Sequence, residues 1–196
     1  MEWLVENGVT NIILGIGYRH EQIEAFFGNG KKWGASISYS VEAEPLGTGG
    51  ALKLAEPLLD ERFFMINGDD INRFELEPLA ELHKKTNAWG TIAVRHIEDV
   101  SSSGSVELAG ERITAFREKT GEKKPGWVNA GTYLLEKKAL GLMPNGFNLI
   151  EKTLFPRLAQ EGQLSGFGHA GLWLRTDTFE RLETAEKELR KKPVFS

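Results

Sequence analysis

The chain has 196 residues, of which 40% are hydrophobic, and its 24 basic and 28 acidic side chains give a formal net charge of −4. This length and apolar content suit a single domain with a substantial core, and the charge balance gives no reason to expect binding to nucleic acid or to an acidic membrane. The sequence has no cysteine, no run close to the roughly 20 apolar residues of a membrane span and no leader-like start, so we expect a cytoplasmic protein without disulfides.

The first half of the chain alternates short apolar strands with amphipathic helices. We expect Thr48 to cap the third of these helices and His83 to lie on a solvated face of the fourth. The rhythm predicts an α/β fold with a Rossmann-like, mainly parallel but mixed sheet and helices on both faces. The expected strands are 11–15, 36–41, 62–66 and 89–95, and the expected helices are 1–8, 20–27, 48–54 and 76–85.

The second half of the chain changes character. Two short strands around 109–111 predict a hairpin, and an amphipathic helix over 149–160 contains Pro156, where we expect a kink or a restart. A closing helix over 178–189 has Thr178 as its expected cap. Without an internal repeat or a linker, residues 1–196 are expected to form one domain. The other expected strands are 104–108, 112–116 and 128–135, with 164–167 and 172–174 as edge strands.

A glycine-dense turn is the most specific motif in the chain. Residues 45–51 read Pro-Leu-Gly-Thr-Gly-Gly-Ala, and three glycines within four positions let backbone amides approach a flat ligand. The alternative is a tight turn between a strand and a helix that needs only small residues.

Two adjacent carboxylates form the second informative motif. Asp69 and Asp70 follow Asn67 and Gly68 at the end of the apolar strand 62–66. Neighbouring carboxylates at a buried strand end repel one another and are costly to desolvate, so a bound cation is a natural partner. The alternative is an acid that caps the next helix or lies in its loop, which suits Asp70 better than Asp69.

In their order and spacing, these two motifs resemble the sugar-phosphate nucleotidyltransferases, which join a nucleoside triphosphate to a sugar 1-phosphate. The resemblance covers essentially the whole chain and implies the nucleotide-diphospho-sugar transferase type of fold. Members of this family begin with a strand and a loop of the form G-x-G-T-R-L, and residues 1–8 resemble the helix that follows that segment. The resemblance therefore implies that the triphosphate clamp is missing, and we expect the chain as given to be catalytically poor.

The resemblance also implies which residues bind the nucleotide and the metal. Asp69 matches the acid that holds Mg²⁺ on the phosphates, whereas Asp70 stands where the family varies. The glycine turn would lie against the base and ribose, with Glu42 or Glu44 nearby. The implied nucleotide-binding residues are Glu44, Leu46, Gly47, Thr48, Gly49, Gly50 and Gly68.

Two short motifs resemble those with which the family binds the sugar phosphate. Glu118 and Lys119 resemble its Glu-Lys pair, so the resemblance implies that Glu118 binds sugar hydroxyls and that Lys119 neutralises the sugar 1-phosphate. Asn129 and Gly131 resemble its Asn-Ala-Gly, with Asn129 suited to a sugar hydroxyl. The alternatives are an exposed strand end with mixed charges for the first motif and a strand irregularity for the second.

The segment 173–178 departs from the common family pattern. Many relatives read W-x-D-x-G-T, but here Arg175 occupies the acid's position and the acid comes at Asp177. This is more similar to the cytidylyltransferase-like branch, where Met-Asp-Thr stands at this place. We therefore expect Asp177 to be the second metal ligand. The competing interpretation makes Asp177 or Thr178 the cap of the last helix, and both roles can hold together.

The activity that the resemblance implies is Mg²⁺-dependent transfer of a nucleotidyl group to a sugar 1-phosphate, with release of pyrophosphate. Its catalytic residues would be Asp69, Lys119 and Asp177, its partners would be small molecules, and a homo-oligomer is possible. A related glycosyltransferase is disfavoured because 67–70 contains no D-x-D triplet. A non-catalytic binding or regulatory module stays open. The glycine turn is similar to mannose- and heptose-phosphate guanylyltransferases and the Asp177 segment to cytidylyltransferases, so the sequence leaves the base and the sugar undecided.

Overall fold

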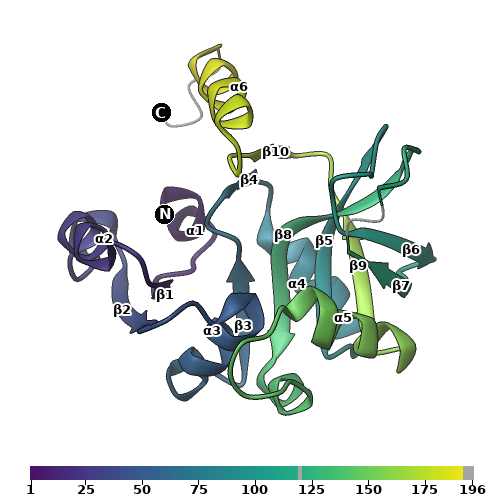
Figure 1. Ribbon diagram of the computed structural model, residues 1–196, viewed down its shortest axis with the longest axis horizontal. Coiled ribbons are helices and arrows are strands. Elements are labelled where there is room, and N and C mark those ends of the chain that lie inside the picture. The colour runs from purple at the N-terminus through teal and green to yellow at the C-terminus, as the bar shows by residue number, and fades with distance from the viewer. Residues whose placement is uncertain (119–120, 192–196) are drawn as a thin grey trace.

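The computed structural model describes residues 1–118 and 121–191 and is built on a six-stranded sheet (Figure 1). The strands follow one another across this sheet in the order β3-β8-β5-β9-β7-β6. Their bounds are β3 (Arg62–Ile66), β5 (Gly90–Ile97), β6 (Ser105–Ala109), β7 (Arg112–Arg117), β8 (Gly126–Glu136) and β9 (Leu164–Gly168).

The predicted mixed α/β sheet is confirmed, but its directions differ from the prediction of a mainly parallel sheet. β5 and β9 are parallel, whereas the long strand β8 runs antiparallel to both β3 and β5. Antiparallel pairs therefore outnumber parallel ones among the pairings of the described residues. The prediction of β9 as an edge strand is also wrong, because β9 lies between β5 and β7, and Leu164 and Ser165 are fully buried.

Two smaller sheets accompany the main one. β1 (Asn11–Ile16) and β2 (Ser36–Val41) form a parallel pair, and β4 (Asp70–Arg73) pairs antiparallel with β10 (Leu172–Arg175). The sequence did not predict β4. Its pairing with β10 is the contact that brings the segment after β3 next to the segment before the last helix.

The helices lie close to their expected positions. They are α1 (Glu2–Glu6), α2 (His20–Phe27), α3 (Gly47–Ala55), α4 (Leu76–Thr86), α5 (Ile150–Gln160) and α6 (Phe179–Lys191), with 3-10 turns η1 (Lys31–Trp33), η2 (Glu56–Leu58) and η3 (Lys137–Leu142). α5 continues through Pro156 without a restart. Thr178 caps α6 as predicted, since its Oγ1 accepts a hydrogen bond from the Arg181 amide. None of the helices in the described residues is long and apolar enough to cross a membrane.

α4 and α5 cover opposite faces of the main sheet. Ile92 and Tyr133 belong to the larger hydrophobic cluster, together with Phe155 of α5. Their strand neighbours Ala93 and Leu134 belong to a second cluster with Leu79 of α4. Successive side chains of a strand point to opposite faces, so the two clusters are the two faces of one sheet, as predicted.

His83 is buried, which corrects the prediction that it is solvated. Its ring nitrogens lie 2.8 Å from Thr91 Oγ1 and 3.1 Å from Glu136 Oε1, and its exposed fraction is 1%. α4 packs this side chain onto β5 and β8. The helical periodicity marks Leu79 and Leu82 as inward, but it does not show that the polar residue after Leu82 finds polar partners on the sheet.

The pKa of His83 gives a test of this environment. Burial lowers that pKa below its ordinary value of 6.5, against the opposing effect of the Glu136 carboxylate. The unfolded chain therefore takes up a proton below about pH 6.5 that folded His83 resists, so stability falls as the pH drops. We expect His83→Gln to flatten the dependence of the free energy of unfolding on pH between about 5 and 6.5. His96→Gln, which removes a histidine at an exposed position, is the comparison variant.

Candidate functional site

A polar pocket of about 140 Å³ lies where β4 and β10 meet the main sheet. It brings together four residues that the sequence predicts as functional and that lie far apart in the chain: Asp69, Glu118, Asn129 and Asp177. The remaining lining residues are Asn67, Asp70, Ser102, Ser103, Gly104, Glu151, Trp173 and Arg175.

The pairing of β4 with β10 places Asp69 close to Asp177 in the fold. Asp70 stands opposite Arg175 in the ladder. Just beyond it, the carbonyl oxygen of Asp69 accepts hydrogen bonds from the Thr176 amide at 2.8 Å and from Thr176 Oγ1 at 2.9 Å. Asp69 and Asp177 are far apart in the sequence, but the hydrogen bonds between the Asp69 carbonyl and Thr176 hold their backbones side by side.

Asp177 takes part in a network with two arginines. Arg181 Nη1 lies 2.8 and 2.7 Å from the two carboxylate oxygens of Asp177, and Arg175 Nη2 lies 3.1 Å from Oδ2. The hydrogen bonds from Arg181, helped by the charge of Arg175, hold the pKa of Asp177 below its ordinary value. The same guanidinium groups also bond to Ser102 and Ser103, so they fasten the turn after β5 to β10 and α6.

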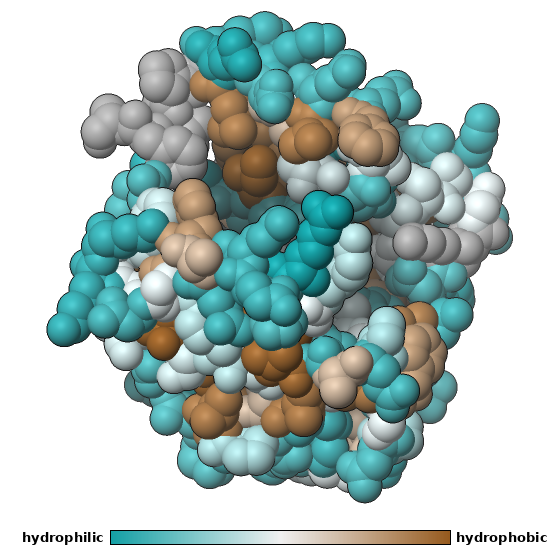
Figure 2. Space-filling model, turned by 60° about the vertical axis from the view of Figure 1, so that its left-hand side comes forward, coloured by the Kyte–Doolittle hydropathy of each residue, from teal (hydrophilic) through white to brown (hydrophobic). Residues whose placement is uncertain are grey.

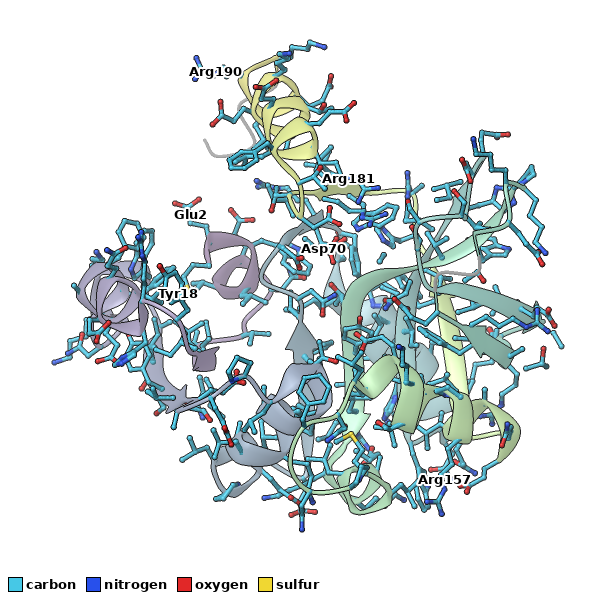
Figure 3. All side chains as sticks on the ribbon, viewed as in Figure 1. Glu2, Tyr18, Asp70, Arg157, Arg181 and Arg190 are labelled. Carbon is cyan, nitrogen blue, oxygen red and sulfur yellow. The ribbon has the colours of Figure 1, made fainter. Side chains whose placement is uncertain are left out.

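Asp70 points into the protein, at the junction below Arg181 (Figure 3). Its Oδ1 accepts a hydrogen bond from Trp173 Nε1 at 2.9 Å, and its Oδ2 lies 3.3 Å from Asn67 Nδ2. Burial is the main reason why the pKa of Asp70 rises to about 6, with the charge of Asp69 acting in the same direction. Asp70 starts β4, so the alternative that it caps a helix or lies in a loop does not apply.

Gly131 makes room for the Asp70 carboxylate. Its φ is +72°, and a Cβ at this position would overlap Asp70 Oδ2. The strand irregularity considered for this residue is present, because the register between β5 and β8 shifts here. Close approach of a ligand to Gly131 stays a proposal, since the side chain that it admits is the protein's own.

Gly131→Ala is therefore expected to destabilise the fold. A left-handed backbone conformation strains alanine, and the new methyl group displaces Asp70, so we expect a loss of about 1–3 kcal/mol in the free energy of unfolding. Gly141→Ala is the matched control, because nothing lies within 4 Å of its Cβ position. Urea denaturation of both variants measures the difference, and equal stabilities would contradict this packing.

Asn129 uses part of its amide within β8. Its Nδ2 donates to Tyr133 Oη at 2.7 Å, and its Oδ1 accepts from the Gly131 amide at 2.9 Å. Tyr133 is fully buried, and burial raises the pKa of its hydroxyl. One N–H and one lone pair of the Asn129 amide remain for a ligand in the pocket.

The glycine turn packs against the segment that leads into α5. The amides of Gly49 and Gly50 both donate to the Asn148 carbonyl, at 2.9 and 3.3 Å, and a Cβ on Gly49 would overlap the Asn148 side chain. This close contact with Asn148 explains why the turn needs small residues at these positions. Binding of a nucleotide at Leu46–Gly50 stays a proposal.

Thr48 does not cap α3, which corrects another prediction from the sequence. The residue that precedes α3 is Leu46, and no side chain caps that helix. The hydroxyl of Thr48 instead accepts a hydrogen bond from the Ile150 amide at 3.0 Å and donates one to Glu151 Oε2 at 2.7 Å. Thr48 therefore caps α5 across the fold and links the glycine turn to a lining residue of the pocket.

Glu44, Glu42 and Gly68 lie outside the pocket lining. Glu44 is exposed, whereas Glu42 accepts the Leu46 amide at 2.9 Å and so holds the glycine turn. Gly68 lines a different hollow, between β1 and β3. Lys119 lies outside the described residues, and its role stays a prediction from the sequence.

The pocket is strongly acidic. Five carboxylates line it, namely Asp69, Asp70, Glu118, Glu151 and Asp177, against the single guanidinium of Arg175. A phosphate group would be repelled from such a pocket unless a cation accompanied it. Among the described residues, no group of three or more His, Cys, Asp or Glu could hold a metal alone. The donors thus fit Mg²⁺, which binds one or two carboxylates and completes its shell with phosphates and water.

Sequence reasoning missed several lining residues. Glu151 stands in the first turn of an amphipathic helix, and Ser102 and Ser103 stand in a polar turn; neither pattern carries a functional signal. Arg175 was a clue to these residues, because a guanidinium group in place of an acid needs a hydrogen-bond acceptor. Ser103 Oγ accepts a hydrogen bond from Arg175 Nη1 at 2.8 Å.

Comparison with known proteins agrees with this fold. The family model described as "Nucleotidyl transferase" matches residues 1–192. The chain is 39% identical over 180 residues to a mannose-1-phosphate guanyltransferase of Yarrowia lipolytica and 37% identical over 181 residues to that of Saccharomyces cerevisiae. Each match covers 89% of this chain but only 50% of the relative. The chain thus spans about half the length of these curated relatives.

Solved structures give the same result. HddC from Yersinia pseudotuberculosis superimposes with a TM-score of 0.83 at 26% identity, covering 96% of this chain and 83% of HddC. A second structure of HddC, complexed with GMP-PN, superimposes with a TM-score of 0.82. Because the family model matches nearly the whole length of the chain, this chain belongs to the sugar-phosphate nucleotidyltransferases of the nucleotidyl transferase family.

Proposed function

We propose that the chain forms the substrate-binding core for transfer of a guanylyl group from GTP to a hexose 1-phosphate, with mannose 1-phosphate as the first candidate. The observation that carries the proposal is the acidic pocket that joins Asp69, Glu118, Asn129 and Asp177. The names of the relatives support the guanine base and the mannose, and the HddC complex with GMP-PN supports a guanine nucleotide.

In this reaction an oxygen of the sugar 1-phosphate attacks the α-phosphorus of GTP. The bond between that phosphorus and the bridging oxygen breaks, and pyrophosphate leaves with its electron pair. Such chemistry depends on positioning and on neutralising charge rather than on a covalent protein intermediate. Asp69 and Asp177 would hold Mg²⁺, which supplies positive charge to the phosphates when it is bound.

The remaining residues have binding roles in the proposal. The free N–H and lone pair of Asn129, together with the Glu118 carboxylate, would bind sugar hydroxyls. The outer side of the turn Leu46–Gly50 and the exposed Glu44 would face the nucleoside. Lys119 would neutralise the sugar 1-phosphate. The network of Arg175 and Arg181 around Asp177 keeps that carboxylate ionised and oriented.

A panel experiment tests this function. Isothermal titration should be measured with five nucleoside triphosphates and with nucleotide sugars including GDP-mannose, and pyrophosphate release with each triphosphate and mannose, glucose or heptose 1-phosphate, at saturating Mg²⁺. We expect GTP and GDP-mannose to bind most tightly. Preference for another nucleotide would overturn the guanine assignment. Absence of binding by every nucleotide and nucleotide sugar would overturn the proposed function itself.

A further inference from the structure

Among the described residues, Arg175 is the single cationic side chain that lines the acidic pocket. Successive side chains of a strand point to opposite sides, so Trp173 and Arg175 of β10 share one side, and both line the pocket. A guanidinium group keeps its charge at every pH at which a protein stays folded. One wall of the pocket therefore has a permanent positive charge, whereas the other charged groups of the lining are carboxylates.

Three hydrogen bonds hold the guanidinium group of Arg175 in place. Nη1 donates to Ser103 Oγ at 2.8 Å, and Nη2 donates to the Ser102 carbonyl at 3.3 Å and to Asp177 Oδ2 at 3.1 Å. Because a guanidinium group has five N–H donors, two remain, one at Nε and one at Nη1, and neither has an acceptor in residues 1–118 and 121–191. Nε is not one of the buried polar atoms without a partner, so it is open to solvent.

The charge of Arg175 is not reserved for Asp177. Arg181 Nη1 lies 2.8 and 2.7 Å from the two carboxylate oxygens of Asp177, closer than Arg175 Nη2. Arg181 thus supplies the nearer partner of that carboxylate. The pocket is unfavourable for an anion beside its other acids, so a phosphate that enters it is drawn to Arg175.

The turn that Arg175 bonds belongs to the part of the pocket that contains Glu118 and Asn129. The Gly104 carbonyl accepts the Asn129 amide at 2.9 Å, and a Cβ on Gly104 would lie 2.9 Å from Glu118 Oε2. The glycine turn reaches the pocket at a different lining residue, Glu151. Arg175 is therefore tied to the residues proposed for the sugar and not to the turn proposed for the nucleoside.

We propose that Arg175 binds the phosphate group of the sugar 1-phosphate through its free donors at Nε and Nη1. The sugar as the source of that phosphate rests on the proposed function, whereas the phosphate contact rests on the pocket itself. A phosphate monoester carries a charge of about −1.5 to −2 at pH 7 and offers strong acceptor oxygens. Hydrogen bonds between a guanidinium group and phosphate are charge-assisted, roughly twice as strong as neutral ones. Because Asp177 contacts the same guanidinium group, the phosphate binds beside the acid proposed to hold Mg²⁺.

A titration with two phosphate monoesters tests this contact. Methyl phosphate carries the phosphate without a sugar, and mannose 1-phosphate carries both. ³¹P nuclear magnetic resonance at saturating Mg²⁺ measures the two dissociation constants. We expect Arg175→Gln to weaken both ligands by the same factor, at least about tenfold, because the lost contact is to the phosphate alone. Binding of GTP, measured by isothermal titration, should stay nearly unchanged.

Two further variants separate charge from general effects of substitution. Arg175→Lys keeps the positive charge without the planar group, so it should lose less affinity for methyl phosphate than Arg175→Gln. Arg157→Gln neutralises an exposed arginine outside the pocket and should leave both dissociation constants unchanged.

Arg181→Gln is the comparison within the arginine network. Figure 2 shows hydrophobic side chains gathered under α6 beside a hollow, which Leu189 lines. Arg181 lines neither that hollow nor the acidic pocket, so its substitution spares the apolar side of α6. It removes the other guanidinium group from Asp177 and Ser102. We expect Arg181→Gln to loosen the turn 101–104 in hydrogen exchange but to weaken methyl phosphate less than Arg175→Gln does.

Three results would overturn the proposal. Equal losses in Arg175→Gln and Arg181→Gln would mean that Arg175 acts only by ordering the turn. Unchanged binding of methyl phosphate in Arg175→Gln would mean that other groups hold the phosphate. Absence of methyl phosphate binding to the unsubstituted chain would mean that the pocket has no phosphate site.

Two additional observations keep the test decisive. If Arg175→Gln does not fold, the ¹⁵N-bound proton signal of Arg175 Nε in the unsubstituted chain decides, because a phosphate on that donor shifts it and an unshifted signal overturns the contact. Failure of the proposed function looks different. In that case GTP and GDP-mannose do not bind, while methyl phosphate still binds and still depends on Arg175, which supports the contact alone.

Discussion

Asp69→Asn is expected to weaken binding of Mn²⁺, used as a probe for Mg²⁺, by at least about tenfold in the presence of GTP. The pocket holds an excess of carboxylates over cationic groups, and Asp69 is an exposed acid of its lining. Removing one charged oxygen ligand from a hard cation costs on the order of 1.4 kcal/mol or more, which is a tenfold change in affinity. Because Asp69 is exposed, the free energy of unfolding should change by less than about 0.5 kcal/mol.

Electron paramagnetic resonance of free Mn²⁺ measures this affinity, with Asp60→Asn as the control for an exposed aspartate outside the pocket. Asp177→Asn should also weaken Mn²⁺ binding, but less, because two guanidinium groups share its carboxylate. If only Asp69→Asn has an effect, Asp177 belongs to the arginine network alone and its role as a metal ligand is withdrawn. Unchanged binding in both variants would contradict the metal site.

Local patterns predicted most of the elements because they depend on neighbours in the chain. The 3.6-residue period gave α4 and α5, and Thr178 was recognised as a cap from its place before an amphipathic run. The directions of the strands were harder to predict from the sequence. β8 has the apolar composition of a buried strand whichever way it runs, so its antiparallel insertion between β3 and β5 left no local signal. Four-residue β4 exists only because β10 pairs with it.

The same division applies to the candidate site. Asp69 was noticed because adjacent carboxylates after a buried apolar strand are costly to desolvate. Asp177 was noticed because the segment 173–178 resembles the family pattern with the acid displaced. Glu151 and Thr48 were not connected in the prediction, since their contact spans 103 residues. His83 was misplaced for a similar reason: its partners lie on β5 and β8, and a helix pattern contains no information about polar groups on a neighbouring sheet. Side chains that act through long-range contacts are thus the ones that sequence patterns leave out.

Phe155→Ala is expected to give the largest loss of stability. Phe155 is fully buried, and its ring lies 5.1 Å from that of Tyr133 and 5.3 Å from that of Phe116, measured between centroids. Truncating a buried phenylalanine removes its transfer free energy and leaves a cavity, at a cost of about 3–5 kcal/mol. Native domains are stable by only about 5–15 kcal/mol, so the variant should be close to unfolding.

Urea denaturation followed by circular dichroism measures this loss, and Phe179→Ala is the control because Phe179 is 89% exposed and should change stability by less than about 0.5 kcal/mol. The substitution should also reach the pocket, because the Tyr133 hydroxyl accepts the Asn129 amide that lines it. A cavity beside Tyr133 lets its ring shift and loosens Asn129, so binding of GDP-mannose should weaken more than binding of GTP. A loss below about 1 kcal/mol would mean that α5 does not seal this face of the sheet.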